Sequence, residues 1–155
     1  MKIPEEVINE VVRPYICKVL RSASLEYPII RGSFFIGPTY YYVYPLEHAT
    51  DIEIQLCLNQ LIYASIAEAI RSKLVPELEG LDFDSLRNEG MLIIESRKRF
   101  RRPIRTDKEI QGEIEITRMR DAGRLILAQA NFQFENRSCF GSLELALIKP
   151  NESLK

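Results

Sequence analysis

A long helix that carries almost no charge, predicted for residues 50–76, constrains the fold of this chain more than any other feature. Thr50 followed by Glu53 is the pattern of a capping box and places the start of the helix there. No side chain between residues 54 and 67 is charged. Since a helix that faces water normally carries Lys and Glu on one side, we expect other structure to wrap around this one.

Polar side chains nevertheless follow one face of this helix. They recur at every fourth residue, and helical geometry places them in one row: Asp51, Gln55, Asn59 and Tyr63. Buried amides need hydrogen-bonding partners, which can be loop carbonyls or a bound substrate. The row is therefore either a structural seam or part of an active site, and the helix by itself favours neither.

Length and cysteine content are those of one ordinary domain covering residues 1–155. A chain of this length buries enough apolar surface to fold without disulfides or a structural metal. The three cysteines are widely spaced and form no Cys-x-x-Cys pair, which predicts neither a disulfide framework nor a zinc site. We therefore expect a cytoplasmic protein that needs no metal and no cofactor.

The charge balance argues against two classes of partner. The chain has 21 Lys and Arg against 22 Asp and Glu, whereas general nucleic-acid binders carry an excess of positive charge. The long uncharged runs 33–46 and 54–67 have 14 residues each, and the first residues contain no apolar signal segment. We therefore expect neither nucleic acid nor a membrane as a partner.

Segments that favour β-structure surround the helix in sequence. Ahead of it we predict a short helix within 4–20, whose length Pro14 limits or whose start it shifts, and two strands over 24–30 and 32–36. After it we predict a polar connection over 76–90. Four further segments, rich in β-branched and aromatic residues, are predicted strands: 91–100, 109–119, 125–134 and 138–148. Two of their connections have hairpin length, so these last strands should run antiparallel in a meander.

This order of elements predicts an α+β fold. One long central helix with a single antiparallel sheet wrapped around it is the arrangement called a hotdog fold. Such a sheet leaves an edge strand and part of a face uncovered. Because a second copy commonly covers them, we expect a homodimer or a higher homo-oligomer.

Two side chains of the long helix could take part in chemistry. Asp51 lies in the first turn, where the helix dipole favours an ionised carboxylate that could orient water or act as a base. A capping role is the alternative for this residue. Asn59 lies two turns further along the same face, where its amide could donate to a carbonyl oxygen that gains negative charge. The alternative is an asparagine that holds a nearby loop.

A run of tyrosines and the single histidine precede the helix. On an extended segment, alternate tyrosines among residues 40–44 face opposite sides, so only one or two could reach a site. His48 is the only histidine, and Cys57 follows it in the helix. A Cys-His nucleophile is one interpretation, and a cysteine used as a small buried residue is the commoner one.

Six cations gather in a predicted strand end and its turn: Arg97, Lys98, Arg99, Arg101, Arg102 and Arg105. In a chain of balanced charge, this run is a candidate site for the phosphates of a pantetheine-bearing cofactor or for the acidic face of a carrier protein. Arginine suits both because it supplies forked, permanently charged donors. A solvated rim of salt bridges is the alternative. No motif for nucleotide binding, for an α/β-hydrolase or for a zinc protease occurs.

Several segments together resemble the FcoT-like long-chain fatty acyl-CoA thioesterase family, whose members have the hotdog fold. The resemblance runs through residues 13–18, 35–37, 53–63, 99–103 and 141–146, and the helix segment Cys-x-Asn-Gln-Leu-x-Tyr is its most specific part. The family includes (2E)-enoyl-ACP glycyltransferases of isonitrile-lipopeptide pathways.

The resemblance implies a site made of two tyrosines and a helix asparagine, at Tyr15, Tyr41 and Asn59, where Tyr41 is one of three consecutive tyrosines. Thr50 stands where the family can carry a further asparagine. The implied substrate is an acyl thioester on CoA or on an acyl carrier protein. The implied reaction is hydrolysis of the thioester or addition of glycine to an enoyl thioester. Both reactions place negative charge on the thioester oxygen, which donors from Asn59 and a tyrosine would stabilise.

We therefore expect an enzyme that acts on fatty acyl thioesters, with an apolar tunnel beside the long helix for the acyl chain. Asn59 and Tyr41 would polarise the carbonyl, Tyr15 would assist proton movement, and Asp51 is a further candidate for positioning water or an amine. A hotdog module that only binds acyl thioesters is the non-enzymatic alternative.

The basic run supplies the expected binding residues for the carrier: Arg97, Arg99, Arg101 and Arg102. In the glycine-addition reaction a cation must also hold the carboxylate of glycine, and Arg99 or Arg101 could do so.

Overall fold

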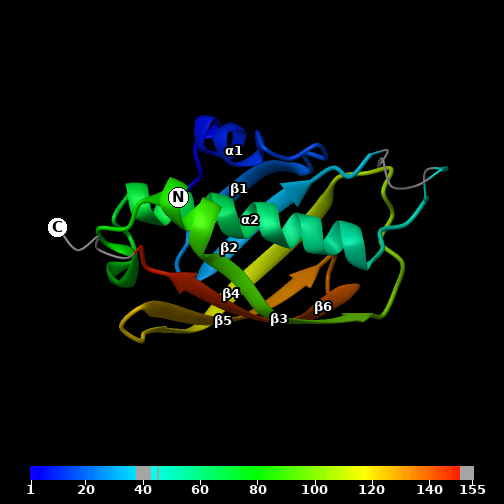
Figure 1. Cartoon of the computed structure of the whole chain (residues 1–155). Helices are drawn as coiled ribbons and strands as arrows, with labels where there is room; N and C mark the ends of the chain where they lie inside the picture. Colours follow the sequence, from blue (N-terminus) through cyan, green and yellow to red (C-terminus); the bar gives the residue numbers. More distant parts are fainter. Residues whose placement is uncertain (38–42, 45, 151–155) are drawn as a thin grey trace.

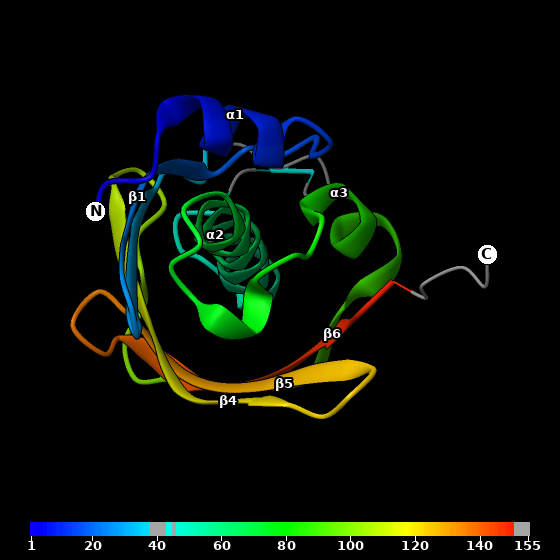
Figure 2. The same cartoon turned by 90° about the vertical axis from the view of Figure 1, so that its left-hand side faces the viewer.

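A central helix and an antiparallel sheet that curves around it make up the structure (Figures 1 and 2). It is a computed structural model and describes residues 1–37, 43–44 and 46–150. Helix α2 (Asp51–Arg71) lies on the concave side of the six-stranded sheet. The predicted α+β hotdog arrangement is confirmed.

Helix α2 begins where the capping box predicts. Glu53 is buried, and its Oε2 accepts a hydrogen bond from the Thr50 N–H at 2.8 Å and another from the Thr50 hydroxyl. At the other end Ser72 is the C-cap, earlier than predicted. The helix stops there because Lys73 has a φ of 51°, which an α-helix does not contain.

The sheet has the strand order β1-β2-β4-β5-β6-β3, with every neighbouring pair antiparallel. The strands have these bounds: β1 (Leu20–Glu26), β2 (Ile29–Phe34), β3 (Met91–Phe100), β4 (Ile110–Asp121), β5 (Leu125–Phe134) and β6 (Cys139–Ile148). Strands β4, β5 and β6 form the predicted meander. Strand β3 pairs with β6 instead of β4 and so becomes an edge strand.

Of two predicted boundaries near the N-terminus, one is wrong. Helix α1 (Glu5–Val12) ends before Pro14, which limits its length because proline has no N–H to continue the helix. The turn between β1 and β2 lies at residues 27–28, inside the segment predicted as one strand. The tyrosine and isoleucine residues beside that turn favour β-structure, so the sequence pattern did not indicate a turn there.

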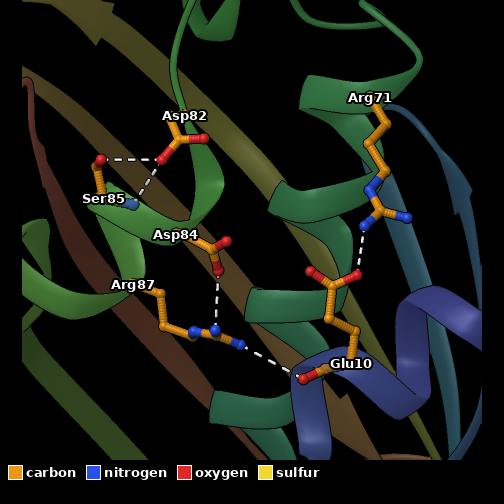
Figure 3. A network of polar contacts seen from close by, with 6 residues as sticks. All are labelled: Glu10, Arg71, Asp82, Asp84, Ser85 and Arg87. Atoms are coloured by element: carbon orange, nitrogen blue, oxygen red, sulfur yellow. Dashed lines mark hydrogen bonds and ion pairs between the residues drawn. The ribbon is translucent and has the colours of Figure 1, made fainter.

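The predicted polar connection 76–90 contains three short helical turns: η1 (Pro76–Leu78), α3 (Phe83–Ser85) and η2 (Leu86–Gly90). Asp82 caps α3, since its carboxylate accepts from the Ser85 N–H at 2.9 Å (Figure 3). Phe83 is buried, and its ring packs edge-on against Tyr63 of α2 with centroids 6.5 Å apart. The segment therefore covers part of α2 that the sheet leaves open.

Gln60 fastens α2 to the segment that leads into β1. Its side chain is fully buried, and its Oε1 accepts from the backbone N–H groups of Val19 and Leu20 at 3.0 Å each. Its Nε2 donates to the carbonyl of Cys17 at 2.7 Å. These bonds fix the rotation of α2, and the adjacent Asn59 is thereby turned toward β3 and β6.

The edge strand β3 exposes apolar side chains. Leu92 and Ile94 of the edge strand β3 are 54% and 57% exposed, although large apolar side chains are usually buried. Among the helices of the described residues, none is long and apolar enough to cross a membrane.

Candidate active site

A cavity of about 240 Å³ lies between α2 and the β3–β6 edge of the sheet. Its walls are apolar apart from one amide and one phenol: Asn59, Ile62, Tyr63, Met91, Leu92, Ile93, Leu145 and Leu147. The polar row predicted on α2 thus reaches a cavity at Asn59 and Tyr63. Apolar walls with a small number of polar groups are typical of a site for a hydrocarbon chain with a polar head.

A chain of hydrogen bonds holds the amide of Asn59. Ser96 Oγ, on β3, donates to Gln55 Oε1 at 3.0 Å, and Gln55 Nε2 donates to Asn59 Oδ1 at 2.9 Å. Because Oδ1 already accepts a hydrogen bond, the Nδ2 hydrogens of Asn59 are the donors left for a ligand.

Two phenols belong to the same region. Tyr63 lies in the cavity wall one helical turn beyond Asn59. Burial raises the pKa of Tyr15 to about 12, the nearby Tyr63 phenol adds to the rise, and the Arg87 guanidinium opposes it. Burial also raises the pKa of Tyr63. Both phenols are therefore neutral at physiological pH and can donate hydrogen bonds.

Arg87, in the η2 segment, is a cation near these phenols, because its charge lowers the pKa of both. Its side chain is 17% exposed, its Nη2 pairs with Asp84 at 2.8 Å, and its Nη1 donates to the Glu10 carbonyl at 3.4 Å. Its guanidinium also lies 5.3 Å from the centroid of the Phe83 ring. Together with the ion pair between Glu10 and Arg71, these contacts join α1, α2 and α3.

A second, more open cavity of about 440 Å³ lies at the N-terminal end of α2. Two segments line it, one at the start of α2 and one at the end of β3 and just beyond: His48, Ala49, Thr50, Asp51, Phe100, Arg101, Arg102 and Pro103. Asp51 is exposed here and pairs with Lys98 of β3 at 3.1 Å. Two turns of helix, about 12 Å, separate it from Asn59. The structure therefore places these two predicted site residues in different cavities.

The arginines predicted to bind the carrier are divided between two faces. Lys98 points toward α2, so its strand neighbours Arg97 and Arg99 point to the opposite, outer face. Arg101 and Arg102 instead line the second cavity. Only the second pair lies at an opening beside the helix.

Two further predictions concern residues outside this geometry. Tyr41 lies outside the described residues, as do the tyrosines on either side of it. Cys57 is completely buried, and burial raises the pKa of its thiol, whereas His48 is exposed. The structure therefore supports the interpretation of Cys57 as a small buried residue.

Sequence reasoning missed Ser96 and Arg87. Ser96 precedes the basic run, and only the packing of β3 beside α2 shows that its hydroxyl contacts Gln55. Arg87 lies in a segment that we predicted to be a polar connection. Its one local signal is Asp84 three residues earlier, which is the spacing of a helical ion pair.

The chain belongs to the FcoT-like thioesterase family. The family model described as "FcoT-like thioesterase domain" matches residues 10–147. The resemblance drawn from the sequence is thereby confirmed, together with a fold that thioesterases share.

Curated relatives carry a more specific name. A protein of Mycobacterium tuberculosis named (2E)-enoyl-[ACP] glycyltransferase is 32% identical over 116 residues, which are 68% of this chain and 63% of the relative. The chain therefore spans less than two thirds of that relative. A protein of the same name from Streptomyces coeruleorubidus is 28% identical over 160 residues, covering 93% of this chain and 96% of the relative.

Solved structures share the fold at low sequence identity. A mutant thioesterase from Pseudomonas aeruginosa superposes with a TM-score of 0.59 at 11% identity, covering 94% of each chain. A virulence protein from Campylobacter jejuni gives a TM-score of 0.55 at 12% identity, covering 98% of this chain and 96% of the other. At these identities the similarity shows the fold alone.

Proposed function

We propose that the protein is an enzyme that acts on a fatty acyl thioester bound between α2 and β3. The observation that carries this proposal is the Asn59 amide beside an apolar cavity, with its oxygen engaged by Gln55 and its N–H groups left to donate. A thioester there would direct its oxygen to the amide and its acyl chain to the apolar walls. Membership of the family supports the same class of substrate.

The reaction we propose is addition of glycine to an enoyl thioester. The glycine nitrogen bonds to the β-carbon, and the electron pair of the double bond moves to the thioester oxygen as an enolate. The nitrogen then loses a proton and the α-carbon gains one, so the thioester bond stays intact. The names of the relatives support this reaction. So does the lining of the first cavity, where no described residue is a carboxylate that could activate water.

Named side chains would divide the work. Asn59 Nδ2 donates to the enolate oxygen, and the neutral phenols of Tyr63 and Tyr15 donate or pass on a proton. Tyr41 keeps the role that the family resemblance implies. Asp51 lies in the second cavity, about 12 Å along α2 from Asn59, so we give it no part in the addition itself.

The carboxylate of glycine needs a fixed cation. Arg99 points to the outer face and Arg101 lines the second cavity, so neither borders the cavity that holds Asn59. Arg87 does not line that cavity either, but its charge acts on the phenol of Tyr63, which does, and its side chain is largely shielded from water; we therefore choose it over Arg99 and Arg101.

Hydrolysis of the thioester is the second candidate, because the family is described as a thioesterase domain. The same donors would stabilise a tetrahedral oxyanion on the same oxygen. Water would then need a base, and Asp51 is the carboxylate on the polar row of α2.

A carrier protein would approach at the second cavity. Arg101 and Arg102 border it, and a pantetheine arm entering beside Asp51 would need to reach about 12 Å along α2 to bring a thioester to Asn59. A negatively charged carrier surface complements these arginines. CoA is the alternative bearer of the thioester.

A second copy of the chain would pair with the edge of β3. Leu92 and Ile93 line the first cavity and are also exposed, so a partner at this edge would close the cavity wall. Burying these side chains would remove an apolar edge that favours association.

The deciding experiment is a mass-spectrometric time course with an enoyl chain on its carrier, with and without glycine. We expect a mass gain of one glycine on the chain that is still attached, formed faster than free acid. Asn59→Ala should lower this rate on the order of a hundredfold, because it removes an oxyanion donor, while thermal unfolding stays unchanged. Free acid formed at the same rate without glycine would favour hydrolysis. If neither product formed, a module that only binds acyl thioesters would be the remaining alternative.

A further inference from the structure

The amide of Asn59 is useful to a thioester only in one orientation. Its Nδ2 can donate to a carbonyl oxygen, whereas its Oδ1 would repel the same oxygen. An asparagine can turn its amide over without changing its shape, so the protein must contain something that prevents this turn.

The structure contains such a constraint in two residues that do not themselves reach the cavity lining. Gln55 Nε2 donates to Asn59 Oδ1 at 2.9 Å, and Gln55 Oε1 in turn accepts from Ser96 Oγ at 3.0 Å. Gln55 and Asn59 are one turn apart on α2, while Ser96 comes from β3. The relay therefore connects the helix to the strand that forms the opposite wall.

We propose that Gln55 and Ser96 are positioning residues that orient the Asn59 amide so that its N–H groups face the substrate oxygen. This inference rests on the proposed function, because it takes Asn59 as the donor to the thioester. In the structure the Ser96 hydroxyl donates to Gln55 Oε1, which leaves the N–H groups of Gln55 to donate to Asn59 Oδ1. If both amides turned over, Asn59 would present an acceptor to the oxygen, and stabilisation of the enolate would be lost.

A substitution at Gln55 tests the direction of the relay. In Gln55→Glu the introduced carboxylate can only accept, so Asn59 must turn its Nδ2 toward it and its Oδ1 toward the cavity. Once protonated, the carboxyl can donate again and restore the native orientation. The charged groups beside it are Asp51 on α2 and Lys98 on β3, which pair with each other, and Cys139 lies near that pair.

We therefore expect the rate of Gln55→Glu relative to the parent to be at least about tenfold low near pH 8 and to rise as the pH falls toward about 5, where carboxyl groups of raised pKa protonate. Dividing by the parent rate at each pH removes the titration of glycine and of shared groups. The change should appear in kcat, with KM little altered, because the enolate forms only along the reaction path.

Two other substitutions complete the test. Gln55→Met has a similar shape but cannot donate, so it should be slow at every pH, and Ser96→Ala should be slowed less. Ser142→Ala, on the neighbouring strand β6 with its side chain on the outer face, is the matched control and should keep the parent rate. Thermal unfolding of each variant identifies any that fails to fold. If Gln55→Glu fails to fold, the rate of Gln55→Met tests the relay in its place.

The outcomes separate the two proposals. A slow Asn59→Ala together with full rates for Gln55→Met and Gln55→Glu would overturn the relay and leave the proposed function standing. A flat pH profile of a slow Gln55→Glu would also overturn the assigned direction. If Asn59→Ala itself keeps its rate, the proposed site is wrong and the relay with it.

Discussion

The role that we propose for a residue of this site depends on the groups that surround it. Asn59 and Gln60 are adjacent amides in one helix, yet Gln60 is fully buried and bonded to three backbone groups, whereas Asn59 has donors left over at a cavity wall. The first is a structural clamp and the second can serve a ligand. The two amides differ in how many of their hydrogen-bonding groups already have partners, and this difference, not the residue type, separates their roles.

The neutral state of Tyr15 can be tested through stability. Its pKa is raised to about 12 by burial first and by Tyr63 second, against about 10 in an unfolded chain. Above about pH 10 the unfolded state loses this proton while the folded state keeps it, so the free energy of unfolding should fall as the pH rises from about 10 to about 12. Tyr15→Phe should weaken this fall, and Tyr63 leaves part of it in place.

Urea unfolding at several alkaline pH values measures this effect. Tyr44→Phe, which removes an exposed phenol, is the control and should keep the parent's slope. An identical slope for Tyr15→Phe and the parent would contradict the burial of a neutral phenol at this position.

At the scale of elements, the clamp between α2 and β1 determines which face of the helix meets the cavity. Gln60→Leu keeps a side chain of similar volume but leaves the buried N–H groups of Val19 and Leu20 without a partner. We expect a loss of about 3 kcal/mol in the free energy of unfolding, since each unpaired buried group costs about 1–3 kcal/mol. Chemical denaturation should show this, while Gln129→Leu on the exposed face of β5 should stay within about 0.5 kcal/mol of the parent.

A Gln60→Leu protein as stable as the parent would mean that sheet and core packing alone hold the helix. The catalytic rate of Gln60→Leu is a second measurement on the same variant. If the clamp sets the rotation of α2, the rate should fall along with the stability, because Asn59 would no longer be held at the cavity.

The elements show how far sequence reasoning reaches. Helix α2 was predictable because its capping box and its uncharged run are local signals, and the last three strands because alternation and short turns are local too. The turn at residues 27–28 was missed because β-favouring side chains flank it. The partner of Gln55 was out of reach, since Ser96 lies 41 residues away and only the folded sheet brings it close.

At the scale of the whole molecule, the apolar edge of β3 predicts association. Ile94→Lys places a charge where a second copy would pack, so we expect the protein to shift toward a monomer in sedimentation or light-scattering measurements. Gln129→Lys adds the same charge to the middle of the sheet, on a strand paired on both sides, and should leave the oligomeric state unchanged. A parent protein that is monomeric at high concentration would refute this use of the edge.

Whether a thioester oxygen accepts a hydrogen bond from Asn59 is tested most directly by infrared spectroscopy of a bound acyl thioester labelled with ¹³C at its carbonyl. In the absence of glycine, we expect the carbonyl stretch to lie at lower frequency in the complex with the parent protein than in an apolar solvent, because a hydrogen bond to oxygen weakens the C=O bond. In Asn59→Ala the band should return toward the apolar position while the ligand stays bound. The same band position in both complexes would contradict the role of Asn59 on which the proposed function depends.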